Sequence, residues 1–223
     1  MTETEENYLK AIYKLAEKEP DDKPVSTNAI AGLLGTTPAS VTDMIKRLAQ
    51  KELVHYKSHR GVSLNHPGHE LAVNLVRKHR LWEVFLVEKL QFSWDEVHDI
   101  AEQLEHIHSP ELIQRLDRFL GHPRFDPHGD PIPDAEGNFT ERKQIILALT
   151  GPGTSGVIVG VNEHSPPFLQ YLDRMQLTIG TPLKVLEVFE FDGSMKVLIQ
   201  HEREVVLSPK IVENLYIQKK NIS

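Results

Sequence analysis

The sequence predicts a mainly α-helical chain with a small β portion, divided into three domains. Apolar residues recur with the helical period of about 3.6 over most of residues 3–120. After about residue 151 they alternate with polar residues, which is the period of a β-strand. A connector rich in proline and glycine, 121–138, separates the two patterns. The expected domains are 1–66, 67–140 and 141–223.

Composition narrows the class of protein before any motif is considered. The chain has 223 residues, 39% of them hydrophobic, which is enough for a sizeable core. It has no Cys, so disulfides, thiolate zinc sites and cysteine nucleophiles are excluded, and a reducing compartment fits. No apolar run approaches the roughly 20 residues of a bilayer span, and the acidic N-terminus is unlike a signal peptide. We therefore expect a cytoplasmic protein.

The net charge of −7 is unevenly distributed along the chain. Residues 1–65 and 141–223 each carry nine Lys or Arg against nine Asp or Glu, whereas 66–140 carry seven against fourteen. Within 36–66, five basic residues accompany only two acidic ones. A locally basic segment thus precedes a strongly acidic one, and the total charge does not argue against DNA binding.

The first domain has the element order of a winged helix-turn-helix. Helical spacing predicts helices over 3–18, 26–34 and 37–54, with Gly35 breaking the chain between the last two. Residues 54–65 alternate around a glycine, which predicts a two-stranded hairpin. A tight turn between two short helices lets the second present its polar N-terminal half to a major groove.

The residues expected to contact DNA lie on that second helix and on the hairpin. Hairpin cations would contact phosphates, which position a protein without reading sequence. The alternative is a compact helical module that uses this fold for protein contacts, but the basic residues concentrate where DNA binding needs them. The expected DNA-binding residues are Thr37, Ala39, Ser40, Thr42, Asp43, Lys46, Lys57, His59 and Arg60.

Three further helices are expected in the middle segment, over 67–90, 93–108 and 110–120. Ser93 and Glu96 have the spacing of a capping box, which sets the register of the second helix. The connector that follows contains His122 and His128, which we expect to satisfy hydrogen bonds in turns.

The second of these helices carries a candidate metal site. At about 100° per residue, three side chains share a narrow arc and a fourth lies beside them. The preceding helix carries His79 and Glu83 one turn apart. A single His/Glu pair is more commonly part of a solvated face, but pairs on two helices of an acidic segment favour a cation, because uncompensated carboxylates repel. The four side chains of the second helix are His98, Glu102, Glu105 and His106.

The C-terminal segment predicts a small SH3-like β-barrel. Its β-type runs read GVIVGV, LKVLEVFEF, MKVLIQ, REVVLS and LYIQ, and Asp192-Gly193 is a hairpin signal. The segment has no Gly-rich phosphate loop and no Ser–His–acid spacing. Nothing in it indicates an enzyme.

Several stretches together resemble one known family over nearly the whole chain: ENYLKAIYKL, TPASVTDMIKRL, KHRLWEVFLVEKL, WDEVHDIAEQLEHI and HGDPIP, followed by the barrel. They are similar to the diphtheria-toxin-repressor and manganese-transport-regulator family of metal-dependent transcriptional repressors. The resemblance implies an N-terminal winged helix-turn-helix, a helical metal-binding and dimerisation domain, and a C-terminal SH3-like β-barrel. It implies a homodimer interface in the acidic middle domain that includes 107–120.

The resemblance also implies two metal sites. His79, Glu83 and His98 correspond to the family's ancillary site. The barrel ligands of the iron regulators fall near His164, with Glu163 as the alternative. The primary site corresponds to Glu102, Glu105, His106 and Asn7.

Two positions of the first helix depart from the family pattern. The manganese regulators usually have Asp where Asn7 stands and Glu where Lys10 stands, so two separated sites are expected rather than a close pair of ions. Carboxylate and imidazole donors without thiolate suit Mn²⁺ first and Fe²⁺ second, while Zn²⁺ or Co²⁺ would bind in vitro.

The implied function is metal-activated repression of metal-uptake genes by a homodimer on a palindromic double-stranded DNA operator, with no membrane partner and no organic cofactor. Two alternatives stay open. A carboxylate-bridged dimetal enzyme needs two Glu-x-x-His motifs, and in the middle helices only Glu105–His108 has that spacing. A winged-helix regulator of an organic ligand would keep its DNA binding when Glu102 and His106 are replaced by Ala.

Overall fold

The protein is described from a computed structural model that covers residues 1–17, 23–57 and 60–220. The predicted His59 lies outside these ranges. Over the described residues, no helix combines the length and apolar character needed to cross a membrane. The chain divides into two compact units, which are described separately: unit 1 is Met1–Trp82, Glu102–Arg115 and Pro133–Phe139, and unit 2 is Glu83–Ala101, Leu116–Ile132 and Thr140–Ser223.

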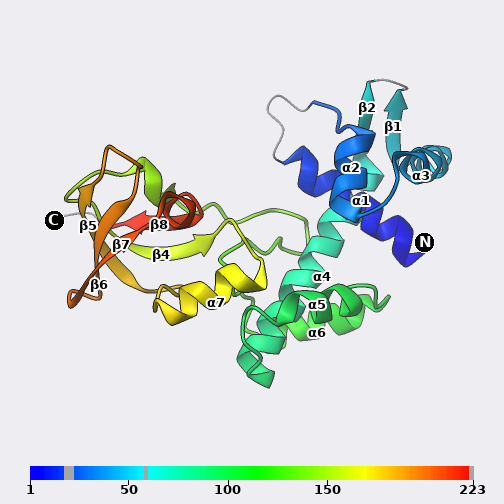
Figure 1. Cartoon of the computed structure of the whole chain (residues 1–223). Coiled ribbons are helices and arrows are strands. Elements are labelled where there is room, and N and C mark those ends of the chain that lie inside the picture. Colours follow the sequence, from blue (N-terminus) through cyan, green and yellow to red (C-terminus); the bar gives the residue numbers. More distant parts are fainter. Residues whose placement is uncertain (18–22, 58–59, 221–223) are drawn as a thin grey trace. The chain divides into compact units, whose positions relative to one another are not determined.

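Unit 1 begins with the three helices and the hairpin predicted for a winged helix-turn-helix: α1 (Glu3–Ala16), α2 (Thr27–Leu34), α3 (Pro38–Gln50), β1 (Val54–Lys57) and β2 (Gly61–Leu64) (Figure 1). Each helix has a polar N-cap whose side chain accepts a backbone N–H, at Thr2, Ser26 and Thr37. Gly35 ends α2 with φ 60°, a left-handed conformation that glycine adopts without strain. This glycine makes the tight turn into α3.

One apolar core joins these elements. Val41, Ile45 and Leu48 form the buried stripe of α3, and β1 pairs antiparallel with β2. The N-terminal part of α4 (His66–Leu90) adds Val73 and Val76 to the same core. Because α4 contributes to this core, the winged module and the start of the middle segment fold as one unit.

The remaining helices of the middle segment are α5 (Val97–Leu104) and α6 (Pro110–Phe119). The prediction of one helix over 93–108 is wrong at both ends. Ser93 Oγ donates to the carboxylates of Asp95 and Glu96 at 2.5 and 2.8 Å instead of accepting a backbone N–H, so only half of the capping box forms. Residues 105 and 106 lie in the turn that follows α5.

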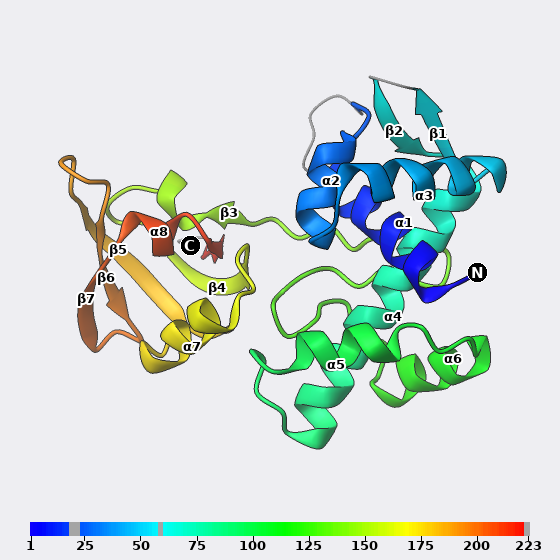
Figure 2. The ribbon, with the colours of Figure 1, turned by 45° about the vertical axis from the view of Figure 1, so that its right-hand side comes forward.

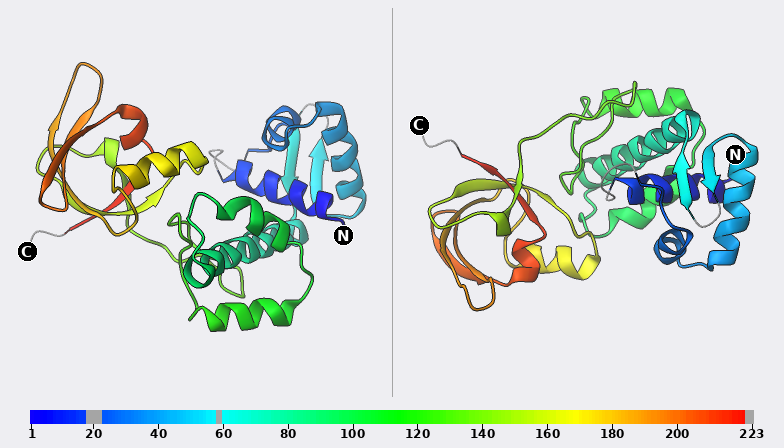
Figure 3. Two further views of the ribbon diagram at one scale, coloured as in Figure 1. Left: turned by 60° about the horizontal axis from the view of Figure 1, so that its bottom comes forward. Right: turned by 90° about the horizontal axis from the view of Figure 1, so that it is seen from above.

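The C-terminal part of unit 2 is a six-stranded antiparallel sheet in the order β3-β8-β4-β5-β6-β7. Figure 2 labels β3 to β7 of this sheet. Five strands were predicted: β4 (Ser155–Val161), β5 (Pro182–Val188), β6 (Met195–Ile199), β7 (Arg203–Leu207) and β8 (Leu215–Lys219). The strands curl around a core that includes Ile158, Val185 and Leu215 (Figure 3). Register shifts in β4 and β5 mark β-bulges, which let a sheet bend in this way.

Four short elements of this part were not predicted: β3 (Ile145–Ile146), the 3₁₀ helix η2 (Leu147–Leu149), α7 (Pro166–Arg174) and α8 (Pro209–Val212). Both α7 and α8 begin with proline in the first turn, where a missing N–H costs nothing. Leu169 and Leu172 of α7 are buried in the core of the sheet. The predicted fold class, a winged helix-turn-helix followed by further helices and a C-terminal β-rich part, is confirmed.

The connector between the helices and the sheet is an ordered turn. Asp126 Oδ1 accepts the backbone N–H groups of His128 and Asp130, both at 2.9 Å. The His128 carbonyl accepts the N–H of Val161 on β4 at 3.0 Å. This attachment to β4 fixes the side chains of the connector within unit 2.

Candidate metal centre

The turn after α5 brings His106 against α1 within unit 1. His106 Nδ1 lies 2.5 Å from Glu6 Oε2. Because a carboxylate only accepts, Nδ1 carries the proton and Nε2 keeps its lone pair. That nitrogen lies 4.0 Å from Glu105 Oε1. A carboxylate that holds one ring nitrogen of a metal-binding His is a common arrangement, since it fixes the tautomer and the ring orientation.

Glu105 is fully buried and its two oxygens have different surroundings. Oε2 lies 2.5 Å from both Lys10 Nζ and His79 Nδ1. Oε1 has no hydrogen-bond donor within the part of the chain that the structure describes. Burial raises the pKa of Glu105, but the hydrogen bond from His79 and the charge of Lys10 outweigh it and lower the pKa. The carboxylate is therefore ionised and has one oxygen without a donor.

Asn7 and Glu102, the other predicted members of this site, differ in the surroundings of their side chains. Asn7 lies one turn before Lys10 on α1, and its Oδ1 is buried without a hydrogen-bond donor among the described residues. Glu102 is half-buried near the end of α5. Within residues 1–17, 23–57 and 60–220, two groups of three His, Asp or Glu place ligand atoms within 4.8 Å of one another, and neither includes Glu102, Glu105 or His106.

The first of these two groups includes the predicted ancillary residues Glu83 and His98, both in unit 2. The third predicted ancillary residue, His79, lies one turn before Glu83 on α4 and belongs to unit 1. His98 Nδ1 lies 3.5 Å from Glu83 Oε1. The assignment of these residues to the ancillary metal site, which the family resemblance implied, stays a prediction.

The second group is Glu83, Asp126 and His128, all buried and all in unit 2. His128 Nε2 donates to the carbonyl of Trp94 at 2.8 Å, which leaves Nδ1 as the nitrogen with a lone pair in the neutral ring. Nδ1 is buried with no hydrogen-bond partner in the described ranges and lies 3.7 Å from Glu83 Oε2. Such a nitrogen beside a buried carboxylate is ready to coordinate a cation.

The charge state of His128 depends on whether a cation is bound. Burial lowers its pKa, but the nearby carboxylate of Glu83 and the charge of Asp126 outweigh this and raise the pKa to about 9. Without a metal, the imidazolium neutralises Glu83. A metal ion at Nδ1 must therefore displace a proton.

The two predicted ligands near the sheet, His164 and Glu163, have different positions. The ring of His164 stacks on that of His128 with centroids 4.8 Å apart, and its Nε2 lies 4.0 Å from Asp130 Oδ2. The carboxylate of Glu163 instead accepts the backbone N–H of Ser165 at 2.8 Å. His164 is therefore next to the second group, whereas Glu163 is hydrogen-bonded to Ser165, the residue that precedes α7.

Three residues of these sites were missed from the sequence: Glu6, Asp126 and His128. Glu6 is 100 residues from its partner His106. We expected His128 only to satisfy turn hydrogen bonds, which it does through Trp94 while presenting its other nitrogen to Glu83. The spacing Asp-x-His in a Pro- and Gly-rich connector was the available signal.

The residues predicted to bind DNA lie on α3 and the hairpin. Thr37, Ala39, Ser40, Asp43 and Lys46 are exposed, as are Lys57 and Arg60. Thr37 caps α3 by accepting the N–H of Ser40 at 3.2 Å, and the half-buried Thr42 donates to the Pro38 carbonyl at 2.9 Å. One face of α3 is thus packed in the core, while the other presents short polar side chains and a cation.

Comparison with known proteins gives consistent matches along the chain. Residues 1–62 match the family described as "Iron dependent repressor, N-terminal DNA binding domain", and 66–134 match "Iron dependent repressor, metal binding and dimerisation domain". Residues 146–219 match the FeoA domain. A solved manganese-dependent transcriptional repressor in complex with manganese is 35% identical, with a TM-score of 0.85, and the alignment covers 97% of this chain and 100% of that one.

The chain belongs to the diphtheria-toxin-repressor family of metal-dependent transcriptional repressors.

Other family members are similar over the whole length. The iron-dependent repressor IdeR of Mycobacterium leprae (strain TN) is 26% identical over 98% of both chains. The crystal structure of ScaR with bound Zn²⁺ is 32% identical with a TM-score of 0.75, covering 97% of this chain and 99% of that one. As a family member the protein is a DNA-binding repressor rather than an enzyme, it acts in the cytoplasm, and its partners are operator DNA and a second copy of itself.

The side chains of this family member fit a divalent cation. Two buried oxygens have no hydrogen-bond donor within the described chain, Asn7 Oδ1 and Glu105 Oε1. An unsatisfied buried acceptor costs about 1–3 kcal/mol, which a bound cation would remove. Oxygen and imidazole donors without thiolate are suited to hard or borderline ions.

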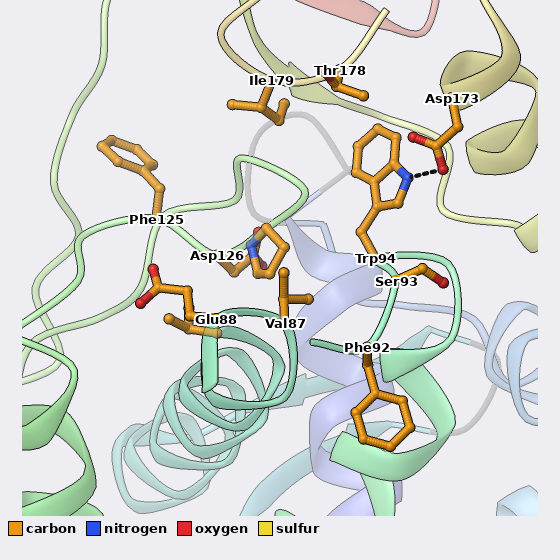
Figure 4. A pocket seen from close by; sticks show the side chains of 12 residues that line it. Val87, Glu88, Phe92, Ser93, Trp94, Phe125, Asp126, Asp173, Thr178 and Ile179 are labelled. Carbon is orange, nitrogen blue, oxygen red and sulfur yellow. Dashed lines mark hydrogen bonds between the residues drawn. The ribbon is translucent and has the colours of Figure 1, made fainter. Parts of the chain in front are cut away.

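Unit 2 of this repressor also contains a cavity of about 450 Å³, lined by α4, the connector and the loop after α7. Phe92, Trp94 and Phe125 contribute aromatic rings, and Trp94 Nε1 donates to Asp173 Oδ2 at 2.9 Å (Figure 4). Asp126 is the one member of the two His/Asp/Glu groups that lines it. Its apolar walls make this cavity unsuitable for a bare cation.

Proposed function

We propose that this repressor binds Mn²⁺, or Fe²⁺ as the second choice, and then binds a palindromic operator that controls metal-uptake genes. The observation that carries the proposal is the pair of buried oxygens without a donor in the described chain, Asn7 Oδ1 and Glu105 Oε1, in a sequence without Cys. With the imidazoles of His106 and His128 they are oxygen and nitrogen ligands, which favour Mn²⁺ and Fe²⁺ over thiophilic ions. Solved relatives include proteins described with manganese, Zn²⁺ and Cd²⁺, so Zn²⁺ or Co²⁺ would also bind in vitro.

Two metal sites are proposed. The first uses Asn7, Glu105 and His106, with Glu102 completing it when metal is bound. The second is centred on Glu83, with His98 on one side of its carboxylate and Asp126 and His128 on the other. His79, one turn before Glu83 on α4, remains a predicted ligand. His164 stands beside the second site, and Glu163 is its alternative.

The first site would act through α1. Asn7 belongs to the helix that packs against α2 and α3, whereas Glu105 and His106 follow α5. A cation bound by both segments would stabilise one orientation of the winged module, and it would favour DNA binding to the extent that it binds that orientation better. The DNA surface would consist of Thr37, Ala39, Ser40, Thr42, Asp43, Lys46, Lys57, His59 and Arg60.

The proposed domain limits are 1–66 for DNA binding, 67–140 for metal binding and dimerisation, and 141–223 for the SH3-like domain. Homodimerisation would use α6, where Leu112 and Phe119 are 37% and 65% exposed. Exposed apolar residues on one helix are typical of such an interface.

The test is operator binding measured with Mn²⁺ and with Fe²⁺ under anaerobic conditions, with a chelator as the baseline. We expect saturating Mn²⁺ to raise operator affinity at least tenfold over the chelated protein. Equal affinity in both states would contradict the proposal. If Mn²⁺ raised the operator affinity of the Glu105→Gln and His106→Ala variants as much as that of the original chain, the cation would act at another site.

A further inference from the structure

Lys10 is a buried cation at the centre of the first site. Lys10 lies on α1 and is only 4% exposed. A lysine ammonium is very seldom buried without a partner, because leaving water is costly. Its Nζ lies 2.5 Å from Glu105 Oε2 and 3.2 Å from His79 Nδ1. Lys10 therefore joins α1 directly to the turn after α5 without any metal.

The ion pair divides the Glu105 carboxylate into two halves. Oε2 accepts from Lys10 and His79, whereas Oε1 has no donor in the described part of the chain and lies 4.0 Å from His106 Nε2. Asn7, one turn before Lys10 on the same helix, contributes the other orphaned acceptor. The positive charge of Lys10 therefore lies at Oε2. The acceptors without a donor in the described chain, Glu105 Oε1 and Asn7 Oδ1, remain available to a cation.

A second lysine adds to the positive charge. Lys78 of α4 is 7% exposed. The carboxylates of Glu6 and Glu105 lie near enough to attract its charge. Two buried ammonium groups thus lie in the field of the carboxylates Glu6 and Glu105, so this part of the molecule is already close to charge balance.

We propose that Lys10 is a built-in counter-ion that occupies the place of a second metal ion beside Glu105. Its ammonium limits the first site to one divalent cation, bound on the Oε1 side of Glu105 with His106 and Asn7. It also holds α1 near Glu105 before metal arrives. The proposal rests on the metal-responsive function above, but it concerns the number of ions bound rather than DNA affinity.

The test counts Mn²⁺ ions on the full-length protein, without DNA, by native mass spectrometry and electron paramagnetic resonance. Lys10→Glu replaces the ammonium with a carboxylate, and we expect one more Mn²⁺ per chain with an exchange-coupled signal from two neighbouring ions. Lys23→Glu makes the same charge change at an exposed residue of unit 1 and should bind as many ions as the original chain. An unchanged count in Lys10→Glu would overturn the proposal.

A second variant keeps the test valid if Lys10→Glu fails to fold. Lys10→Gln removes the charge with little change in size, which leaves Glu105 without its ammonium partner. We expect a lower Tm for the metal-free protein and a larger gain in Tm on adding saturating Mn²⁺ than in the original chain. An equal gain in both proteins would refute the role of Lys10. If metal did not change operator binding but the ion counts were as expected, the proposed function would fail and the role of Lys10 would stand.

Discussion

His106 Nδ1 lies 2.5 Å from Glu6 Oε2, so a carboxylate of the first helix sets the orientation of an imidazole 100 residues later in the chain. The Glu6 side chain is only 6% exposed, and its other oxygen lies 3.7 Å from His108 Nε2. This contact directs His106 Nε2 toward Glu105.

Replacing Glu6 should therefore weaken metal binding although Glu6 is not itself a proposed ligand. We expect Glu6→Ala to lower Mn²⁺ affinity at the first site by about 10–100-fold, the usual cost of losing a partner that orients a ligand. Isothermal titration of the full chain would measure it. Glu3→Ala, at an exposed position of the same helix, is the matched control. Equal affinities in the two variants would show that Glu6 does not position His106.

Gly129 should be irreplaceable in the connector that carries Asp126 and His128. Its φ is +90°, and a Cβ there would lie 2.1 Å from the Val159 carbonyl oxygen of β4. We expect Gly129→Ala to lower the free energy of unfolding by more than about 2 kcal/mol, because backbone strain and a clash with main chain add together. Urea denaturation of the metal-free protein would measure this.

Gly153 provides the control for that substitution. It has a similar φ of +85°, but a Cβ there meets no atom within 4 Å. Gly153→Ala should cost only the conformational strain, about 1–2 kcal/mol. If both variants lost a similar amount of unfolding free energy, the close approach of Gly129 to β4 would not be the reason that a glycine is needed there.

The ion pair between Glu5 and Lys51 should make the stability of unit 1 depend on pH. Glu5 Oε1 lies 2.6 Å from Lys51 Nζ. This bond, and that from the Thr2 backbone N–H, lower the pKa of Glu5. Because the folded pKa is below the unfolded value, the stabilisation is fully present above the unfolded pKa and is lost as pH falls through the folded pKa.

Unfolding free energies of the original chain and of Glu5→Gln, measured from pH 6 down to pH 3, should therefore converge at the acidic end. At neutral pH the difference should stay below about 1 kcal/mol, because Lys51 is half exposed to screening solvent. Asp43→Asn, which removes the exposed partner of Lys46, should show no such convergence. A constant difference across the range would disprove the assignment.

Phe119 should contribute to the homodimer interface. It is 65% exposed on α6 and its ring contacts Phe85 and Lys89. We expect Phe119→Glu to raise the dimer Kd at least tenfold, since an apolar contact of this size contributes about 1.5–3 kcal/mol. Phe191→Glu is the control, because Phe191 is fully exposed in the turn between β5 and β6. Sedimentation velocity of both variants would measure the dimer Kd. An unchanged Kd for Phe119→Glu would show that α6 is not part of the interface.

The sequence predicted what depends on local pattern and missed what depends on distant contacts. Helical spacing located α1–α3 and α4, and alternation located five strands, because burial on one face imposes those periods. The arc drawn for His98, Glu102 and Glu105 assumed a helix that continues past residue 104, and α5 ends there. Glu6 and Lys10 had no local signal, since each meets its partner across about 100 residues.

Glu83 presents its two oxygens to different histidines: Oε1 lies 3.5 Å from His98 Nδ1, and Oε2 lies 3.7 Å from His128 Nδ1. An ion held on one side would leave little negative charge for another on the opposite side, which agrees with one ion in the second site. The two sets of ligands around Glu83 would then compete for that ion, and the repressor would respond through a single occupancy there.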